Sequence, residues 1–131
     1  MESQFKRFLV LTGFLNILGG LVSIIWFRKF FEVFYFIRYQ KEINGALLLN
    51  HILFFAFVII MGFGLIKASA SVNQEKLFVQ ISAFSMIYTS LTWIASVLKD
   101  HNSSLLFIPS FIEGIMGFYF LYSLKKQNLN E

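Results

Sequence analysis

The sequence contains no cysteine. This absence excludes disulfide bonds, thiol redox relays and cysteine-ligated metal sites. It also excludes the usual quinone-linked, disulfide-forming type of membrane enzyme, because that chemistry depends on pairs of cysteines. Any redox or metal chemistry in this protein would have to use other side chains.

Charged residues are scarce, since only 14% of the chain is Asp, Glu, Lys or Arg. Most of them lie outside four long apolar runs, and Glu113 is the one such residue inside a run. A bilayer core of about 30 Å is crossed by roughly 20 helical residues, a length that each run reaches. The sequence therefore predicts four membrane-spanning helices, over residues 8–27, 43–66, 77–98 and 105–124.

The runs also lack the polar–apolar alternation of the strands of a membrane barrel. The chain is 57% hydrophobic with a mean hydropathy of +0.70, which leaves too little polar surface for a soluble bundle. In lipid each run must satisfy its backbone groups internally, as a helix does. We predict an all-α integral membrane four-helix bundle with up-down-up-down topology. It would form a single transmembrane domain over residues 1–131, with both termini on the same side.

Basic residues outnumber acidic ones, and the net charge is +4. They stand at the ends of the apolar runs, so contact with anionic lipid head groups explains them better than a nucleic-acid partner. Of the eleven Lys and Arg residues, six fall on the side of the termini and five on the opposite side. This difference is too small to decide the orientation, and cytoplasmic termini are our working expectation.

The connection over residues 28–42 mixes aromatic and basic residues, which suits a membrane–water interface. We predict an interfacial helix there, although the charges of the whole connection do not collect on one helical face. Glycines inside the runs indicate close helix packing within one bundle rather than a dedicated dimer seam. Pro109 is the only proline and should kink the fourth helix or mark its start.

Two ionisable side chains lie inside the apolar runs, His51 in the second and Glu113 in the fourth. Such residues are costly in lipid and mark a site by default. Both runs enter from the side of the first and third connections, and at about 1.5 Å per residue each side chain lies about 12 Å deep. We predict that one polar group from each helix faces inward at this depth and that the groups meet. The other candidates in this layer are Asn16, Asn50, Tyr88, Thr89, Thr92 and Trp93.

Three interpretations of this layer stay open. A protonated Glu113 can serve as structural hydrogen-bonding glue, the layer can line a ligand pocket, or it can belong to a proton or ion path. A haem is disfavoured because the other histidine, His101, lies in a short turn too shallow to pair with His51. His51 and Glu113 alone are too few ligands for a metal, so we expect no metal and no resident cofactor.

The serines inside the third and fourth runs have no nucleophile-elbow context. We therefore interpret them as hydroxyls that serve helix packing, and no catalytic residue is assigned. They are Ser82, Ser85, Ser90, Ser96 and Ser110.

The layout resembles that of the DoxX-like small four-helix membrane proteins. The shared features are the chain length, the glycine-bearing first helix (Gly13-Phe-Leu-Asn-Ile-Leu-Gly-Gly20), the interfacial first connection and an acid in the fourth helix (Ile112-Glu113-Gly114). The resemblance implies a multi-pass protein of a bacterial inner membrane, in a class with some members linked to quinone oxidoreductase systems. No catalytic residue carries over from it. The small multidrug transporters place their essential glutamate in the first helix, whose apolar run has no acid here.

Our leading hypothesis is an accessory protein that binds a lipid-like or quinone-like molecule in an intramembrane polar pocket. The pocket would open toward the side of the first and third connections. One alternative is a proton-coupled transporter or channel subunit that acts as an oligomer. Another is a membrane isomerase or transferase that uses Glu113 and His51 as an acid–base pair. The expected partners are the lipid bilayer, a hydrophobic small molecule, and further copies or a larger membrane complex.

Overall fold

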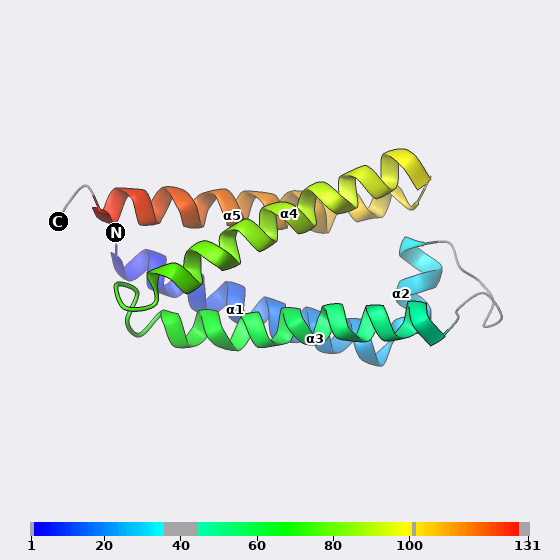
Figure 1. Ribbon diagram of the computed structural model, residues 1–131, viewed down its shortest axis with the longest axis horizontal. Helices are drawn as coiled ribbons and strands as arrows, with labels where there is room; N and C mark the ends of the chain where they lie inside the picture. Colours follow the sequence, from blue (N-terminus) through cyan, green and yellow to red (C-terminus); the bar gives the residue numbers. More distant parts are fainter. Residues whose placement is uncertain (1, 36–44, 101, 129–131) are drawn as a thin grey trace.

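Two tightly packed helix pairs build the protein in the computed structural model (Figure 1). Helix α1 (Glu2–Ile25) pairs with α3 (Gly45–Ala68), and α4 (Lys76–Asp100) pairs with α5 (Phe107–Asn128). Contacts between the pairs are fewer than contacts within them. The structure describes residues 2–35, 45–100 and 102–128. The start of α1 and the end of α5 lie at the same end of the bundle (Figure 1), which confirms the predicted all-α, up-down-up-down arrangement.

Within the described residues, four helices are long and apolar enough to cross a membrane. Their spans are Ser3–Ile25, Gly45–Ala68, Lys76–Lys99 and Ser104–Lys126. All four long helices run past the apolar stretches at one end or both, and the longest extensions are those of α1, which begins at Glu2, and α5, which ends at Asn128. A helix continues through its polar flanks because backbone hydrogen bonding does not require apolar side chains. The chain is a small multi-pass membrane protein.

A short helix, α2 (Phe27–Phe34), follows a break in the helix at Trp26 and lies at the end of the bundle opposite the start of α1 (Figure 1). Phe31 is buried on its inner side, whereas Arg28, Lys29 and Glu32 are exposed. Helix α2 is therefore clearly amphipathic, and the expectation of no clean charged face was wrong for this segment. The reason is that the expectation applied one periodicity to residues 28–42, whereas the helix ends at Phe34. Residues 36–44 lie outside the described part.

The C-terminal end of α2 is hydrogen-bonded to the α4–α5 connection. The backbone N–H of Ser103 donates to the carbonyl of Phe34 at 3.0 Å. Ser103 also caps the short helical turn η1 (Ser104–Leu106), which leads into α5. Pro109 stands in the first turn of α5, where its missing N–H removes no hydrogen bond from the helix interior. This agrees with the prediction that Pro109 marks the start of the last helix.

The apolar core lies in the half of the bundle that holds the start of α1. Phe5 and Leu9 of α1 meet Leu65 of α3 and Phe120 of α5, and all four side chains are fully buried. The rings of Phe5 and Phe120 pack edge to face with centroids 6.0 Å apart. This half of the bundle is closed by close contact between apolar side chains.

Glycines let the backbones touch within each pair. A Cβ atom added at Gly13 would lie 2.6 Å from the carbonyl oxygen of Gly62, and one added at Gly62 would lie 2.6 Å from that of Gly13. In the other pair, a Cβ at Gly117 would lie 2.7 Å from the carbonyl oxygen of Ala83. By contrast, a Cβ at Gly19 would meet nothing within 4 Å. Most helical glycines thus serve packing inside the pairs, and Gly19 does not.

We expect Gly13→Ala to destabilise the protein, because its new methyl group would press on the α3 backbone and over-packing costs about 1–3 kcal/mol. Gly19→Ala is the matched control, and it should leave stability unchanged or raise it by up to about 1 kcal/mol through helix propensity. The measurement is the thermal midpoint of detergent-solubilised protein, followed by the monodisperse fraction on size exclusion. Equal midpoints for the two variants would contradict the packing role of Gly13.

Candidate functional site

Three adjoining cavities lie between the helix pairs, from the middle of the bundle to the end that holds α2. We call them the inner chamber, of about 50 Å³, the mouth cavity, of about 420 Å³, and the side recess, of about 310 Å³. Phe55 of α3 and Trp93 of α4 line all three. These two aromatic side chains therefore form the walls at which the cavities meet.

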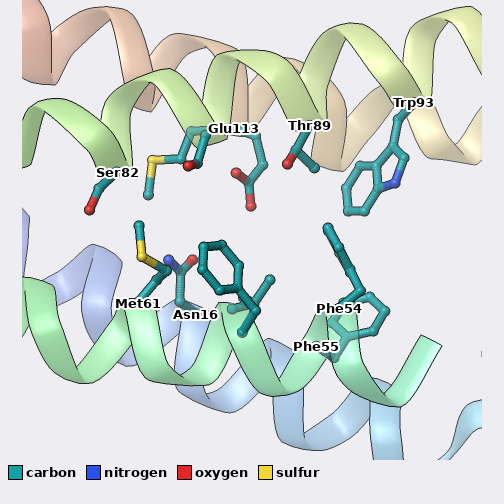
Figure 2. A pocket seen from close by; sticks show the side chains of 12 residues that line it. Asn16, Phe54, Phe55, Met61, Ser82, Thr89, Trp93 and Glu113 are labelled. Carbon is teal, nitrogen blue, oxygen red and sulfur yellow. The ribbon is translucent and has the colours of Figure 1, made fainter. Parts of the chain in front are cut away.

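The inner chamber gathers polar side chains from three helices. Glu113 projects between the two helix pairs from α5, Thr89 comes from α4, and Asn16 faces them from α1 (Figure 2). The hydroxyls of Ser82 and Ser85 of α4 extend this polar lining, while methionine and phenylalanine side chains close the rest. The chamber is thus a small, mostly apolar cavity into which a few polar side chains converge.

Asn16 and Glu113 carry the unused hydrogen-bonding capacity of the chamber. Asn16 is only 8% exposed, yet among the described residues neither side chain makes a hydrogen bond. A cavity of about 50 Å³ exceeds the roughly 10–15 Å³ that one water needs, so water or the polar atoms of a ligand can satisfy these groups. No Lys or Arg of the described chain lines the chamber. Because an ionised carboxylate without a countercharge is costly here, a protonated Glu113 fits this environment, and it would both donate and accept hydrogen bonds.

His51 lies at the base of the mouth cavity. Its Nε2 is 2.8 Å from the carbonyl oxygen of Ser23 in α1, so Nε2 carries the proton in this hydrogen bond. The imidazole ring also packs against Phe30, Phe31 and Phe55, with centroids 4.7–4.9 Å away. His51 thereby fastens α3 to the end of α1, beside the break that leads into α2.

The rim of the mouth cavity is more polar than its base. Asn50 and Thr92 are exposed there, and Ser96 and Asn102 form a hydrogen bond with each other at 2.5 Å. Tyr35 lines the same cavity, and burial raises the pKa of its phenol above the ordinary value of 10.0. Burial thus favours the protonated phenol of Tyr35, which can donate a hydrogen bond into the cavity.

The side recess runs from the polar centre of the bundle to its outer surface. Its inner end contains Asn16 and Glu113, which it shares with the chamber. Its outer edge is formed by Leu15, Gly19 and Val22, which are exposed on α1. At this depth the exposed surface of α1 faces hydrocarbon, so the recess opens sideways toward lipid.

The predicted polar layer separates into two groups along the bundle. Asn16, Thr89 and Glu113 meet in the inner chamber, whereas Asn50, His51 and Thr92 line the mouth cavity, and Trp93 lines both. Counting residues from the helix ends placed His51 and Glu113 at one depth, but no cavity described above contains both. His51 contacts Ser23, which is seven residues beyond Asn16 and so about 10 Å farther along α1.

Tyr88 departs from its predicted inward position. It is 72% exposed, and it faces the surroundings of the bundle. Neighbouring residues of a helix are separated by about 100°, so the inward direction of Thr89 turns Tyr88 away from the chamber. The Tyr88 side chain is therefore not part of the candidate site.

Sequence reasoning missed several residues of the site. Ser82 and Ser85 were interpreted as packing hydroxyls, and the structure places both on the chamber wall. Their spacing with Thr89 and Trp93 marks one stripe along α4, a pattern that could have identified them. Ser90 and Ser110 do fit the packing interpretation, since Ser90 faces Gly114 and Ser110 bonds the carbonyl of Leu106. In the described residues, no group of three or more His, Cys, Asp or Glu side chains could hold a metal ion.

We expect His51→Leu to lower stability, because it leaves the Ser23 carbonyl without the imidazole donor. Loss of a buried hydrogen bond of this kind costs about 1–3 kcal/mol. The neighbouring exposed position provides the control, and Asn50→Leu should have little effect. The measurement is the thermal midpoint of each variant in detergent. Equal midpoints for His51→Leu and Asn50→Leu would show that the hydrogen bond from His51 to Ser23 does not stabilise the protein.

Comparison of the chain with protein-family models, with curated proteins and with solved structures finds no match.

Proposed function

We propose that this protein binds a membrane-soluble amphiphile with a neutral, hydrogen-bonding head group, such as a quinone, between its two helix pairs. The observation that carries the proposal is the meeting of Asn16, Thr89 and Glu113, from three different helices, beside the shared aromatic walls Phe55 and Trp93. Such a role fits an accessory protein of a bacterial inner membrane, alone, as an oligomer or within a larger complex.

The size and lining of the cavities support a small-molecule ligand. Ligand pockets have volumes of about 300–1,000 Å³ and are mostly apolar, with a few convergent polar groups. The mouth cavity and the side recess, of about 420 and 310 Å³, fall in this range. The convergent polar groups are those around Glu113, at the inner end of the recess.

The chemistry of the lining favours a neutral and planar head group. A protonated Glu113 and the amide of Asn16 can both donate hydrogen bonds to carbonyl oxygens. Phe55 and Trp93 offer ring faces and edges on which a planar head can pack. A carboxylate head, as in a fatty acid anion, would lie beside Glu113 and Phe side chains without a cation to pair with, which disfavours that class.

The arrangement gives less support to transport or to acid–base catalysis. A polar path through one subunit would have to cross the packed half of the bundle, at Leu9, Leu65 and Phe120. An acid–base pair of His51 and Glu113 would have to share a reacting molecule. The two residues line different cavities, and the described structure has no hydrogen bond between them.

Trp93 provides a direct test, because it lines all three cavities and the only other tryptophan, Trp26, is exposed. In a Trp26→Phe protein in nanodiscs, we expect decylubiquinone to quench Trp93 fluorescence with a saturable dependence on its concentration. A Trp93→Phe protein, which retains Trp26, should show only the linear quenching of quinone dissolved in the bilayer. Linear quenching of Trp93 as well would overturn the proposed binding.

Variants at position 113 then test the role of the carboxyl in the same assay. Glu113→Gln keeps a neutral donor and should retain binding, whereas Glu113→Leu should weaken it by about tenfold through loss of one hydrogen bond. Tyr88→Phe on the outer surface is the control and should bind like the parent. Equal loss in Glu113→Gln and Glu113→Leu would show that the ligand needs a charged carboxylate, which contradicts the neutral-head proposal.

A further inference from the structure

We propose that the ligand enters the space between the helix pairs sideways from the bilayer, with its hydrocarbon tail held in the side recess at Gly19. This inference rests on the proposed function and names its substrate class. The ligand would be a bilayer-borne molecule with a tail, rather than a compound that arrives from water. Three features of the structure support this route: the polarity of the recess, two adjacent glycines, and a groove that continues the recess toward the membrane surface.

The polarity of the side recess fixes the orientation of a bound amphiphile. Asn16 and Glu113 stand at its inner end, and Leu15, Gly19 and Val22 stand at its outer edge. A head group at the inner end meets hydrogen-bonding partners, and a tail that leaves past Gly19 meets lipid. The opposite orientation would place the end of a hydrocarbon chain against a carboxyl and an amide, leaving both without partners.

Gly19 and Gly20 are neighbours with opposite surroundings. A Cβ added at Gly20 would lie 2.6 Å from Cγ1 of Ile59 and 3.0 Å from the carbonyl oxygen of Phe55, so this glycine allows α1 to pack against α3. A Cβ added at Gly19 would meet nothing within 4 Å, although Gly19 lines the recess. Packing within the pair therefore explains Gly20 but not Gly19. The missing side chain at Gly19 leaves the recess open toward lipid.

A second, shallower groove of about 190 Å³ continues the recess toward the membrane surface. The two share Val22, Ser23, Phe30 and Phe34. The groove ends at Trp26 and Lys29, residue types that anchor at the membrane–water interface. The lining of the groove is almost entirely apolar, so it can hold a hydrocarbon tail that extends from the recess toward the interface while the head group stays beside Glu113.

The test compares two probes that differ only in the tail, using Trp93 fluorescence in the Trp26→Phe background. The probes are decylubiquinone and the same dimethoxy-methyl-benzoquinone head without the decyl chain. Gly19→Leu fills the outer edge of the recess and should weaken decylubiquinone binding by about tenfold, equal to the lost burial of roughly two methylene groups. The tailless head can still enter through the mouth cavity, so its affinity should change by less than about twofold.

Gly45→Leu is the matched control, because Gly45 also has nothing within 4 Å of an added Cβ and lines none of the described cavities. It should bind both probes like the parent. If Gly19→Leu does not give a monodisperse protein, Val22→Phe narrows the same edge and replaces it. If Gly19→Leu, or Val22→Phe in its place, changed the affinity for both probes equally or changed neither, sideways access would be overturned. Absence of saturable binding of decylubiquinone to the Trp26→Phe parent, which retains Gly19, would instead refute the proposed function itself.

Discussion

Direct contact between helix backbones within each pair is the constraint on which the rest of the structure depends. In lipid no hydrophobic force drives helices together, so close packing at small residues decides which helices associate. Gly13 and Gly62 make this contact between α1 and α3, and Gly117 makes it against Ala83 between α5 and α4. The pairs are consequently tight units, and the contacts between them are fewer. Any space inside the protein therefore lies between the pairs rather than within them.

The space between the helix pairs is filled by different groups at its two ends. Near the start of α1 it is filled by Phe5, Leu9 and other apolar side chains, and the pairs are in close contact. At the opposite end α2 inserts the buried Phe31 and is fixed by the hydrogen bond from Ser103 to Phe34. Phe31 lines the mouth cavity, and Phe30 and Phe34 line the side recess. The inner face of this amphipathic surface helix thus forms part of the wall of both cavities.

The sequence predicted the fold well because lipid leaves few choices: a long apolar run in a bilayer is a helix, and short connections make neighbours antiparallel. Axial counting also brought Asn16, Thr89 and Glu113 to one depth, and they do meet. The direction of each side chain was much less predictable. These helices are apolar on nearly every face, so hydrophobic periodicity does not show how a helix is rotated about its axis. The outward direction of Tyr88 and the place of Ser82 on the chamber wall were not foreseen for this reason, since only the packing partners of α4 determine which side chains face inward.

The same glycines that allow packing also aim the carboxyl of Glu113. Gly114 and Gly117 of α5 face α4, where added Cβ atoms would lie 2.8 Å from Oγ of Ser90 and 2.7 Å from the carbonyl oxygen of Ala83. Because this glycine face must meet α4, the rotation of α5 about its axis is fixed. Glu113 lies about 40° from Gly117 and about 100° from Gly114 around the helix, so it stands at the edge of the glycine face, and from there it projects into the space between the pairs (Figure 2). The position of an ionisable group in the membrane is thus set by its uncharged neighbours, and the chamber is a consequence of how α5 must pack.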